Sequence, residues 1–248
     1  MNIVIPMAGS DEPFRKHGFP FAKAVTEIDG RPLIEHAFDC LKPVPNARFA
    51  FVIRKEDDMR FRLRDVLKLL DPDAAVIRAD GPTAGAACTA LLAVEHISND
   101  DELIIANGDQ ILDFDVTAAI RSFRARDLDA GTIVFDSVHP RWSFVKTNED
   151  GLVVEASEKR PISRNATAGV YYFKKGRYFV EAAQIMIRKG ASVNGAYFVC
   201  PTFNELILLQ KRVGIVQVER DQYTSLATPQ AIEEYEQVLA ARKRSARG

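Results

Sequence analysis

Three short segments place small and polar residues where a predicted strand ends: Ala8-Gly9-Ser10, residues 80–85, and Asn107-Gly108-Asp109-Gln110. Small residues let backbone N–H groups approach a ligand closely, as a phosphate-binding loop requires. A carboxylate backed by a glycine, as in Asp109, suits Mg²⁺, which takes one or two protein carboxylates and fills its shell with water and phosphate oxygens. Each segment alone is also explained by an ordinary turn or helix N-cap. Together with Lys23 in the first loop, they predict a nucleoside triphosphate site.

The elements that must position these segments follow from the periodicity of the first half. Apolar runs predict buried strands over residues 3–7, 49–53, 74–77 and 102–106. Amphipathic patterns between them predict helices that start at Pro32, cover residues 59–70 and cover residues 83–97. This alternation predicts a parallel sheet with helices on both faces, and the carboxyl ends of such strands share one edge where ligands bind.

The second half has a different pattern, typical of an antiparallel extension of the sheet. Runs rich in β-branched and aromatic residues predict strands over 131–138, 142–147, 151–159, 168–173 and 214–219. Helices are predicted over 178–188 and 203–212, and a last one from Pro229. We therefore expect one α/β domain over residues 1–248, a three-layer α/β/α Rossmann-like fold with a mixed, mostly parallel sheet.

Composition excludes several classes of protein. The formal net charge of −1 does not favour a general nucleic-acid or membrane-surface role. No apolar run approaches the length of a membrane span, and the first residues lack the pattern of a signal peptide. The four histidines and three cysteines have no metal-ligand or redox spacing. We expect a cytoplasmic protein that is a monomer or a homodimer.

The motifs resemble those of the nucleotidyltransferases that make nucleotide-activated sugars, over nearly the whole chain. The resemblance lies in "IVIPMAG…F…GF…K…IDGRPLIEH", "GPTAGAACTALLA", "LIIANGDQ" and "VEASEKRPISRNATAGVYYFKKG", which follow the family's order. The segments "NGDQ", "HPRWSF" and "YFVCPTFNELI" resemble a bacterial subgroup encoded with capsule and surface-polysaccharide genes. One activity in that subgroup is a phosphoglutamine cytidylyltransferase. The resemblance implies a fold of the glycosyltransferase-A type, with a nucleotide-binding half near 1–115 and an acceptor-binding half near 116–248.

The resemblance also implies roles for matched positions. Lys23 and Asp109 are the expected catalytic residues, and Asp109 is the expected Mg²⁺ ligand. The expected nucleotide-binding residues are Met7, Ala8, Gly9, Ser10, Lys23, Gly81, Thr83, Ala84, Ala87, Asn107 and Gly108. The expected acceptor-binding residues are Trp142, Glu158, Lys159, Gly169 and Asn194. Packing in the core is an equal alternative for Trp142, and Asn194 is also a typical turn former.

The implied reaction is an in-line attack by an acceptor phosphate on the α-phosphorus of an NTP, with pyrophosphate as the leaving group. Relatives favour CTP, and the acceptor is expected to be a sugar 1-phosphate or a phosphoglutamine-like molecule. A phosphate monoester is already anionic near neutral pH, so no general base is needed. The enzyme's task is to position the reactants and stabilise charge, with Mg²⁺ as cofactor.

The chain departs from the family's pattern in its first loop. The second glycine and the arginine that relatives have in this loop are missing, and the loop contains two acids, Asp11 and Glu12. Acids repel a triphosphate unless they are turned away or bridged by metal. Arg15 and Lys16 are candidates to replace the missing arginine. Many relatives supply a second metal carboxylate near the C-terminus, where this chain has Ser225.

Two other functions stay open from the sequence. The first is a glycosyltransferase that consumes a nucleotide-sugar, because Asp113-Phe114-Asp115 has the two-aspartate spacing that such enzymes use. Asp115 is, however, also a typical helix N-cap. The second is a non-catalytic nucleotide-binding protein, which the altered first loop suggests. Arg141 and Arg164 are candidates to bind an acidic acceptor, with solvated surface arginines as the alternative.

Overall fold

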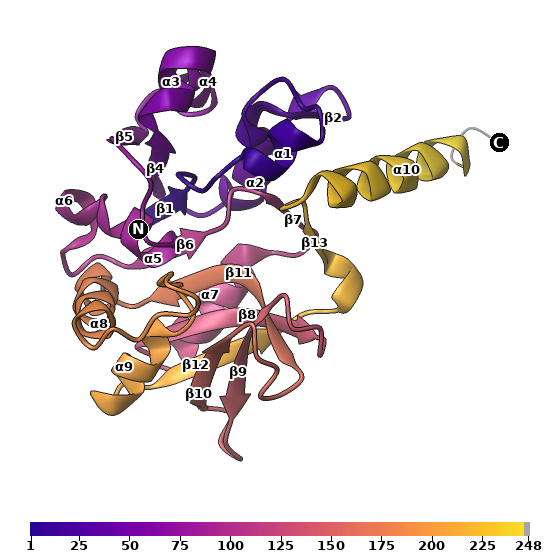
Figure 1. Cartoon of the computed structure of the whole chain (residues 1–248). Coiled ribbons are helices and arrows are strands. Elements are labelled where there is room, and N and C mark those ends of the chain that lie inside the picture. Colours follow the sequence, from indigo (N-terminus) through magenta and orange to yellow (C-terminus); the bar gives the residue numbers. More distant parts are fainter. Residues whose placement is uncertain (246–248) are drawn as a thin grey trace.

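The computed structural model describes residues 1–245, and within them nine strands form one mixed sheet flanked by helices (Figure 1). The sheet consists of β1 (Asn2–Pro6), β4 (Arg48–Arg54), β5 (Ala75–Ala79), β6 (Leu103–Ala106), β8 (Ala130–Asp136), β9 (Ser143–Thr147), β10 (Val153–Glu158), β11 (Asn165–Phe173) and β12 (Val213–Gln217). Two short ribbons are formed by β2 (Glu27–Ile28) with β3 (Arg31–Pro32), and by β7 (Gln110–Leu112) with β13 (Tyr223–Ser225).

The helices cover both faces of the sheet. They are α1 (Glu12–Lys16), α2 (Leu33–Leu41), α3 (Lys55–Phe61), α4 (Leu63–Leu70), α5 (Ala86–Leu91), α6 (Val94–Ile97), α7 (Val116–Ala125), α8 (Gly176–Arg188), α9 (Thr202–Leu208) and α10 (Pro229–Ser245). Two 3₁₀ helices are η1 (Lys23–Val25) and η2 (Arg220–Gln222). Helix α10 extends away from the body at the side of β7 and β13 (Figure 1). Among residues 1–245, no helix combines the length and apolarity needed to cross a membrane.

The strand order creates the point at which a ligand is expected. The path through the sheet is β10-β9-β11-β6-β1-β4-β5, and β8 joins it by pairing with β11 and β12. Strands β5, β4, β1 and β6 are parallel, with β4 on one side of β1 and β6 on the other. The connections therefore diverge at the carboxyl ends of β1 and β6, and open sheets of this kind bind ligands at that switch point.

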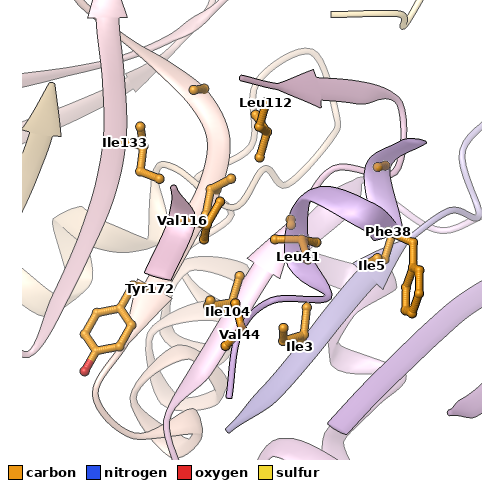
Figure 2. Packing of buried hydrophobic residues seen from close by; sticks show 14 of the residues in the cluster. Ile3, Ile5, Phe38, Leu41, Val44, Ile104, Leu112, Val116, Ile133 and Tyr172 are labelled. Carbon is orange, nitrogen blue, oxygen red and sulfur yellow. The ribbon is translucent and has the colours of Figure 1, made fainter. Parts of the chain in front are cut away.

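Alternating side chains along the central strands enter two cores on opposite faces. On β1, Ile3 and Ile5 join the core beneath α2, α4 and α7, while Val4 joins the core beneath α5, α8 and α9. Figure 2 shows Ile3 and Ile5 with Phe38 and Leu41 of α2. Burial on both faces explains why these strands read as continuous apolar runs. The expected α/β fold, with a parallel core and an antiparallel extension, is confirmed.

Two predicted helices were wrong in their extent. The helix expected over residues 59–70 is two helices, because Arg62 has a left-handed backbone (φ 53°) between α3 and α4. Met59, the first residue of that expected amphipathic helix, is 74% exposed. The helix expected over 83–97 starts only at Ala86 and is divided into α5 and α6. Gly85 precedes it with φ +107°, a conformation that ends rather than continues a helix.

Some elements have no clear signal in the sequence. Helix α1 lies in a segment expected to be a loop, and β7 and β13 were not predicted as strands. The ribbon of β7 and β13 aligns Gln110 with Ser225 although they are far apart in the chain. Strands of three residues carry little local pattern, so only the long-range pairing defines them.

Candidate active site

A cavity of about 360 Å³ lies at the switch point of the sheet. Met7 and Gly9 enter it after β1, and Asn107, Gly108 and Asp109 enter it after β6. Its other wall comes from the antiparallel extension, through the start of β9, the end of β10 and the first half of β11. The cavity therefore joins the edge predicted to bind a nucleotide with the half predicted to bind an acceptor.

Lys23 and Asp109 form an ion pair inside this cavity. The Lys23 Nζ lies 2.7 Å from the Asp109 Oδ2, and the two side chains are 26% and 18% exposed. Burial acts to lower the pKa of Lys23, but Asp109 and Asp11 outweigh it and raise that pKa above its usual value. The Lys23 ammonium is therefore charged at neutral pH and is positioned in the cavity by its partner.

The backbone around Asp109 is fixed by the ribbon of β7 and β13. The Asp109 carbonyl oxygen accepts a hydrogen bond from the Leu226 N–H at 2.8 Å. This contact brings Ser225 to the cavity wall, at the position where relatives are expected to supply a second metal carboxylate. Among residues 1–245, no group of three or more His, Cys, Asp and Glu side chains is arranged to hold a metal ion. One carboxylate in an open cavity fits Mg²⁺ bound mainly by substrate oxygens and water.

Both first-loop acids are paired with basic side chains. Asp11 is 5% exposed, and its Oδ2 accepts hydrogen bonds from the Arg54 Nη2 at 2.8 Å and from the Lys23 backbone N–H at 3.1 Å. Glu12 is on the surface, paired with Lys16 at 2.7 Å. Lys16 therefore does not replace the missing arginine in the cavity, and Arg15 lines a neighbouring hollow instead.

Glu158 and Lys159 stand at the acceptor end of the cavity. Glu158 pairs with Ser143 across β9 and β10, and its carboxylate accepts a hydrogen bond from the Ser143 hydroxyl. Burial raises the pKa of Glu158, against the opposing effects of Ser143 and Lys159. The Lys159 Nζ lies 5.0 Å from the centre of the Phe198 ring. The end of the cavity thus offers a cation and a buried hydrogen-bond acceptor.

The Trp142 side chain borders the cavity, but most of it packs against other aromatic rings. It is 9% exposed, and its ring packs edge-to-face on Phe135 and Tyr223, with centroids 5.4 and 5.6 Å apart. The guanidinium of Arg141 lies 4.2 Å above the Trp142 ring and also borders the cavity. Arg164, the other arginine proposed for an acidic acceptor, pairs with Asp136 on the surface at 2.5 Å and does not line the cavity.

Gly169 brings the backbone of β11 to the end of β6. Its φ is +61°, and it lies at an irregularity in the pairing of β11 with β8. The Gly169 carbonyl oxygen accepts hydrogen bonds from the Asn107 N–H at 3.0 Å and from the Gln110 Nε2 at 3.3 Å. A Cβ at this position would lie 2.4 Å from both the Asn107 Nδ2 and the Gln110 Oε1. Only glycine fits here without displacing these amides.

The structure places some predicted site residues outside the cavity wall. These residues are Ala8, Ser10, Gly81, Thr83, Ala84, Ala87 and Asn194. Ala87 is fully buried and its N–H donates to the Tyr197 carbonyl at 3.0 Å, so its neighbour Ala86 borders the cavity instead. Asn194 lies in an exposed turn with φ 51°. The turn-former explanation therefore accounts for Asn194.

Several residues of the cavity were not predicted. They include Asp11, Asp57, Leu63, Ser143, Thr167, Tyr223 and Ala227. Asp57 could have been predicted, because it closely follows the strand predicted over residues 49–53. Ligands bind beyond the carboxyl ends of parallel strands, and this holds for that strand too. Ser143, Thr167 and Tyr223 had none, since only the pairing of distant strands brings them to the wall.

The two-aspartate motif is not part of this cavity. Asp113, Phe114 and Asp115 border a separate hollow, together with residues at the end of α2. Asp115 is the N-cap residue of α7, as the alternative explanation predicted. The motif therefore offers no metal ligand at the switch point, and the geometry does not support a glycosyltransferase that uses it.

Comparisons with known proteins agree with this geometry. A model of the MobA-like NTP transferase domain matches residues 15–244. A nucleoside-diphosphate-sugar pyrophosphorylase from Vibrio cholerae has a similar structure, with a TM-score of 0.83, 23% identity, and coverage of 95% of this chain and 99% of that chain. An inositol-1-phosphate CTP transferase from T. maritima has a TM-score of 0.74 at 15% identity, with 93% and 90% coverage. No curated protein matches the sequence. The chain therefore belongs to the MobA-like NTP transferase domain family and is a nucleotidyltransferase.

Proposed function

We propose that this nucleotidyltransferase transfers the nucleoside monophosphate of an Mg²⁺-bound NTP, with CTP favoured, to the phosphate of a small molecule. The acceptor is a sugar 1-phosphate or a phosphoglutamine-like compound, and the product serves capsule or surface-polysaccharide synthesis. The observation that supports this most is the Lys23–Asp109 ion pair, which lies in a cavity shared by the nucleotide edge and the acceptor end. The structurally similar inositol-1-phosphate CTP transferase from T. maritima supports the same substrate classes.

In this proposal the chemistry needs no covalent enzyme intermediate. An oxygen of the acceptor phosphate forms a bond to the α-phosphorus, and the bond from that phosphorus to the α,β-bridging oxygen breaks to release pyrophosphate. Asp109 would hold Mg²⁺, which would supply charge neutralisation at the phosphates. The Lys23 ammonium, which pairs with Asp109 in the structure, would pair with the α-phosphate when the substrate is bound.

In this proposal, side chains at the acceptor end of the cavity orient the attacking phosphate. Lys159 and Arg141 offer cations to an anionic acceptor, and each lies against an aromatic ring that limits its motion. Glu158, held by Ser143, accepts a hydrogen bond from a hydroxyl or amino group of the acceptor. Positioning of this kind supplies much of the rate acceleration when an enzyme brings two reactants together.

The experiment that tests the function is pyrophosphate release with Mg²⁺. Each of CTP, UTP, GTP, ATP and dTTP is paired with sugar 1-phosphates, inositol 1-phosphate, phosphoglutamine and other small phosphomonoesters. Release with one pair identifies the base and the acceptor together. Release of a nucleoside diphosphate from a nucleotide-sugar instead would identify a glycosyltransferase and contradict the proposal.

Variants of the ion pair test the site. Asp109→Asn and Lys23→Ala should each reduce kcat on the order of a hundredfold or more, because each removes an oriented charge from the reaction centre. Asp113→Asn is the matched control, since Asp113 lies in a different hollow, and it should leave kcat unchanged. Near-normal turnover in both ion-pair variants, with folding verified by circular dichroism, would contradict the assignment of the site.

A further inference from the structure

Asp11 is buried at the edge of the cavity, whereas the adjacent acid, Glu12, is on the surface. Asp11 is 5% exposed, and it borders the cavity at the start of α1. One oxygen of its carboxylate accepts two hydrogen bonds, from the Lys23 backbone N–H at 3.1 Å and from the Arg54 Nη2 at 2.8 Å. Asp11 therefore connects the residue that carries the ammonium with the end of β4.

The Arg54 side chain makes this connection rigid. Arg54 is 13% exposed, and it donates to both oxygens of Asp57, from Nε at 2.7 Å and from Nη2 at 2.8 Å. Paired, planar contacts of this kind fix the guanidinium geometrically. One partly buried cation thus holds two buried carboxylates, one from α1's N-cap and one from α3. We call Asp11, Arg54 and Asp57 the loop clamp.

The Lys23 backbone needs the contact that Asp11 provides. Lys23 is the first residue of η1, and the first N–H groups of a helix have no partner within it. Asp11 supplies an acceptor for that N–H, and so fixes where η1 begins. The position at which η1 begins sets the backbone of Lys23, and therefore the direction in which the Lys23 side chain extends toward Asp109.

We propose that Asp11 is a positioning residue, and that the loop clamp holds Lys23 in the geometry needed for nucleotidyl transfer. The inference rests on the proposed function, because it assigns Lys23 its role at the α-phosphate. In this view the acids of the altered first loop do not impair the site. Asp11 acts through Lys23 and does not contact the substrate.

The first test is kinetic. Asp11→Asn keeps an acceptor oxygen but removes the charge that holds Arg54, and Asp11→Ala removes both. We expect kcat to fall on the order of tenfold in the first variant and a hundredfold in the second, because displacement by about 1 Å can cost a hundredfold. The acceptor KM should change less than about twofold. Glu12→Gln is the matched control, since Glu12 is the adjacent acid and pairs on the surface, and it should behave as the wild type.

The second test separates positioning from general stability. In the Lys23→Gln background, measured under single-turnover conditions at high enzyme concentration, Asp11→Asn should change the residual rate less than about twofold, because residues that act as a unit are not additive. A further tenfold loss in that background would mean that Asp11 does not act through Lys23. An unchanged kcat in both Asp11 variants would also overturn the proposal.

A third measurement does not depend on catalysis. Amide hydrogen exchange at Lys23, followed by NMR, should be at least tenfold faster in Asp11→Ala than in the wild type and unchanged in Glu12→Gln. Unchanged exchange at Lys23 in Asp11→Ala would contradict the clamp. If the wild type released no pyrophosphate with any substrate pair, the proposed function would fail, and faster Lys23 exchange would still support the contact from Asp11.

Discussion

Replacing Gly169 by alanine should damage both stability and activity, for a reason visible in the cavity wall. The new Cβ would lie 2.4 Å from the Asn107 Nδ2 and 2.4 Å from the Gln110 Oε1. Both amides belong to the segment that follows β6, and Gln110 is 1% exposed and so has little room to move. Gly169 also has φ +61°, a conformation that costs a non-glycine residue about 1–2 kcal/mol.

The expected magnitude follows from these two costs. Overpacking of a tight interior typically costs about 1–3 kcal/mol. Added to the backbone cost, Gly169→Ala should lose roughly 2–5 kcal/mol, part of which is offset by about 0.4–1 kcal/mol because alanine reduces the entropy of the unfolded chain. For a chain of this size each kcal/mol corresponds to about 2–4 °C in Tm.

A matched control separates the clash from the backbone strain. Gly151 has a similar φ of +72°, but a Cβ there would meet only the Arg126 Nη2 at 3.7 Å, an ordinary contact. Gly151→Ala should therefore lose only the backbone cost, about 1–2 kcal/mol before the entropy offset, and keep full activity. Gly169→Ala should also lower kcat/KM, because Asn107 borders the cavity.

The assay is urea unfolding of both variants, followed by circular dichroism, together with pyrophosphate release. The difference between the two losses of stability isolates the clash and should be roughly 1–3 kcal/mol. Equal losses in Gly169→Ala and Gly151→Ala would refute the reasoning. So would a Gly169→Ala enzyme with normal kcat/KM.

The remaining predictions concern charge at the site. Burial raises the pKa of Glu158, so keeping it ionised costs stability at neutral pH, and this cost is absent below its usual pKa of about 4.3. Glu158→Gln should therefore raise Tm at pH 7 and leave Tm unchanged at pH 4, as scanning calorimetry at both pH values would show. The same variant should weaken acceptor binding, measured by titration calorimetry. Arg141→Ala should raise the acceptor KM roughly tenfold, because it removes one charged hydrogen bond. Arg164→Ala should leave the acceptor KM unchanged, because Arg164 pairs with Asp136 outside the cavity. Removal of Mg²⁺ by EDTA should stop pyrophosphate release without changing the Tm of the substrate-free enzyme, because an ion on a single carboxylate is bound mainly through substrate oxygens and water. A drop in Tm would indicate a bound structural ion.

Much of the fold could be predicted because its signals are local. The strands read as apolar runs because they are buried on both faces, and β1, β4 and β6 begin and end within two residues of the expected positions. Helix α10 begins at Pro229 as predicted, since proline fits the first turn of a helix. The errors fall where one residue overrides a periodic pattern, as the left-handed backbone of Arg62 does between α3 and α4.

The candidate site also contains residues that local signals could predict and residues that they could not. Gly9 and Asp109 were proposed from segments at strand ends, and both border the cavity because parallel strands share their carboxyl edge. Lys23 was proposed from its place in the first loop and from the family resemblance, and it borders the cavity as well. The roles of these residues remain predictions until substrates are tested.

The alternation of strands and helices and the chemistry of the segments at their ends could be inferred from the sequence, because both depend on residues close together in the chain. The tertiary structure alone shows that Asp11 pairs with Arg54, that Ser225 lies near Asp109, and that Asp113 lies elsewhere. Each of these facts depends on the register and packing of elements far apart in the chain. Local periodicity specifies which face of a strand is buried, and it carries no information about which distant side chain meets it there.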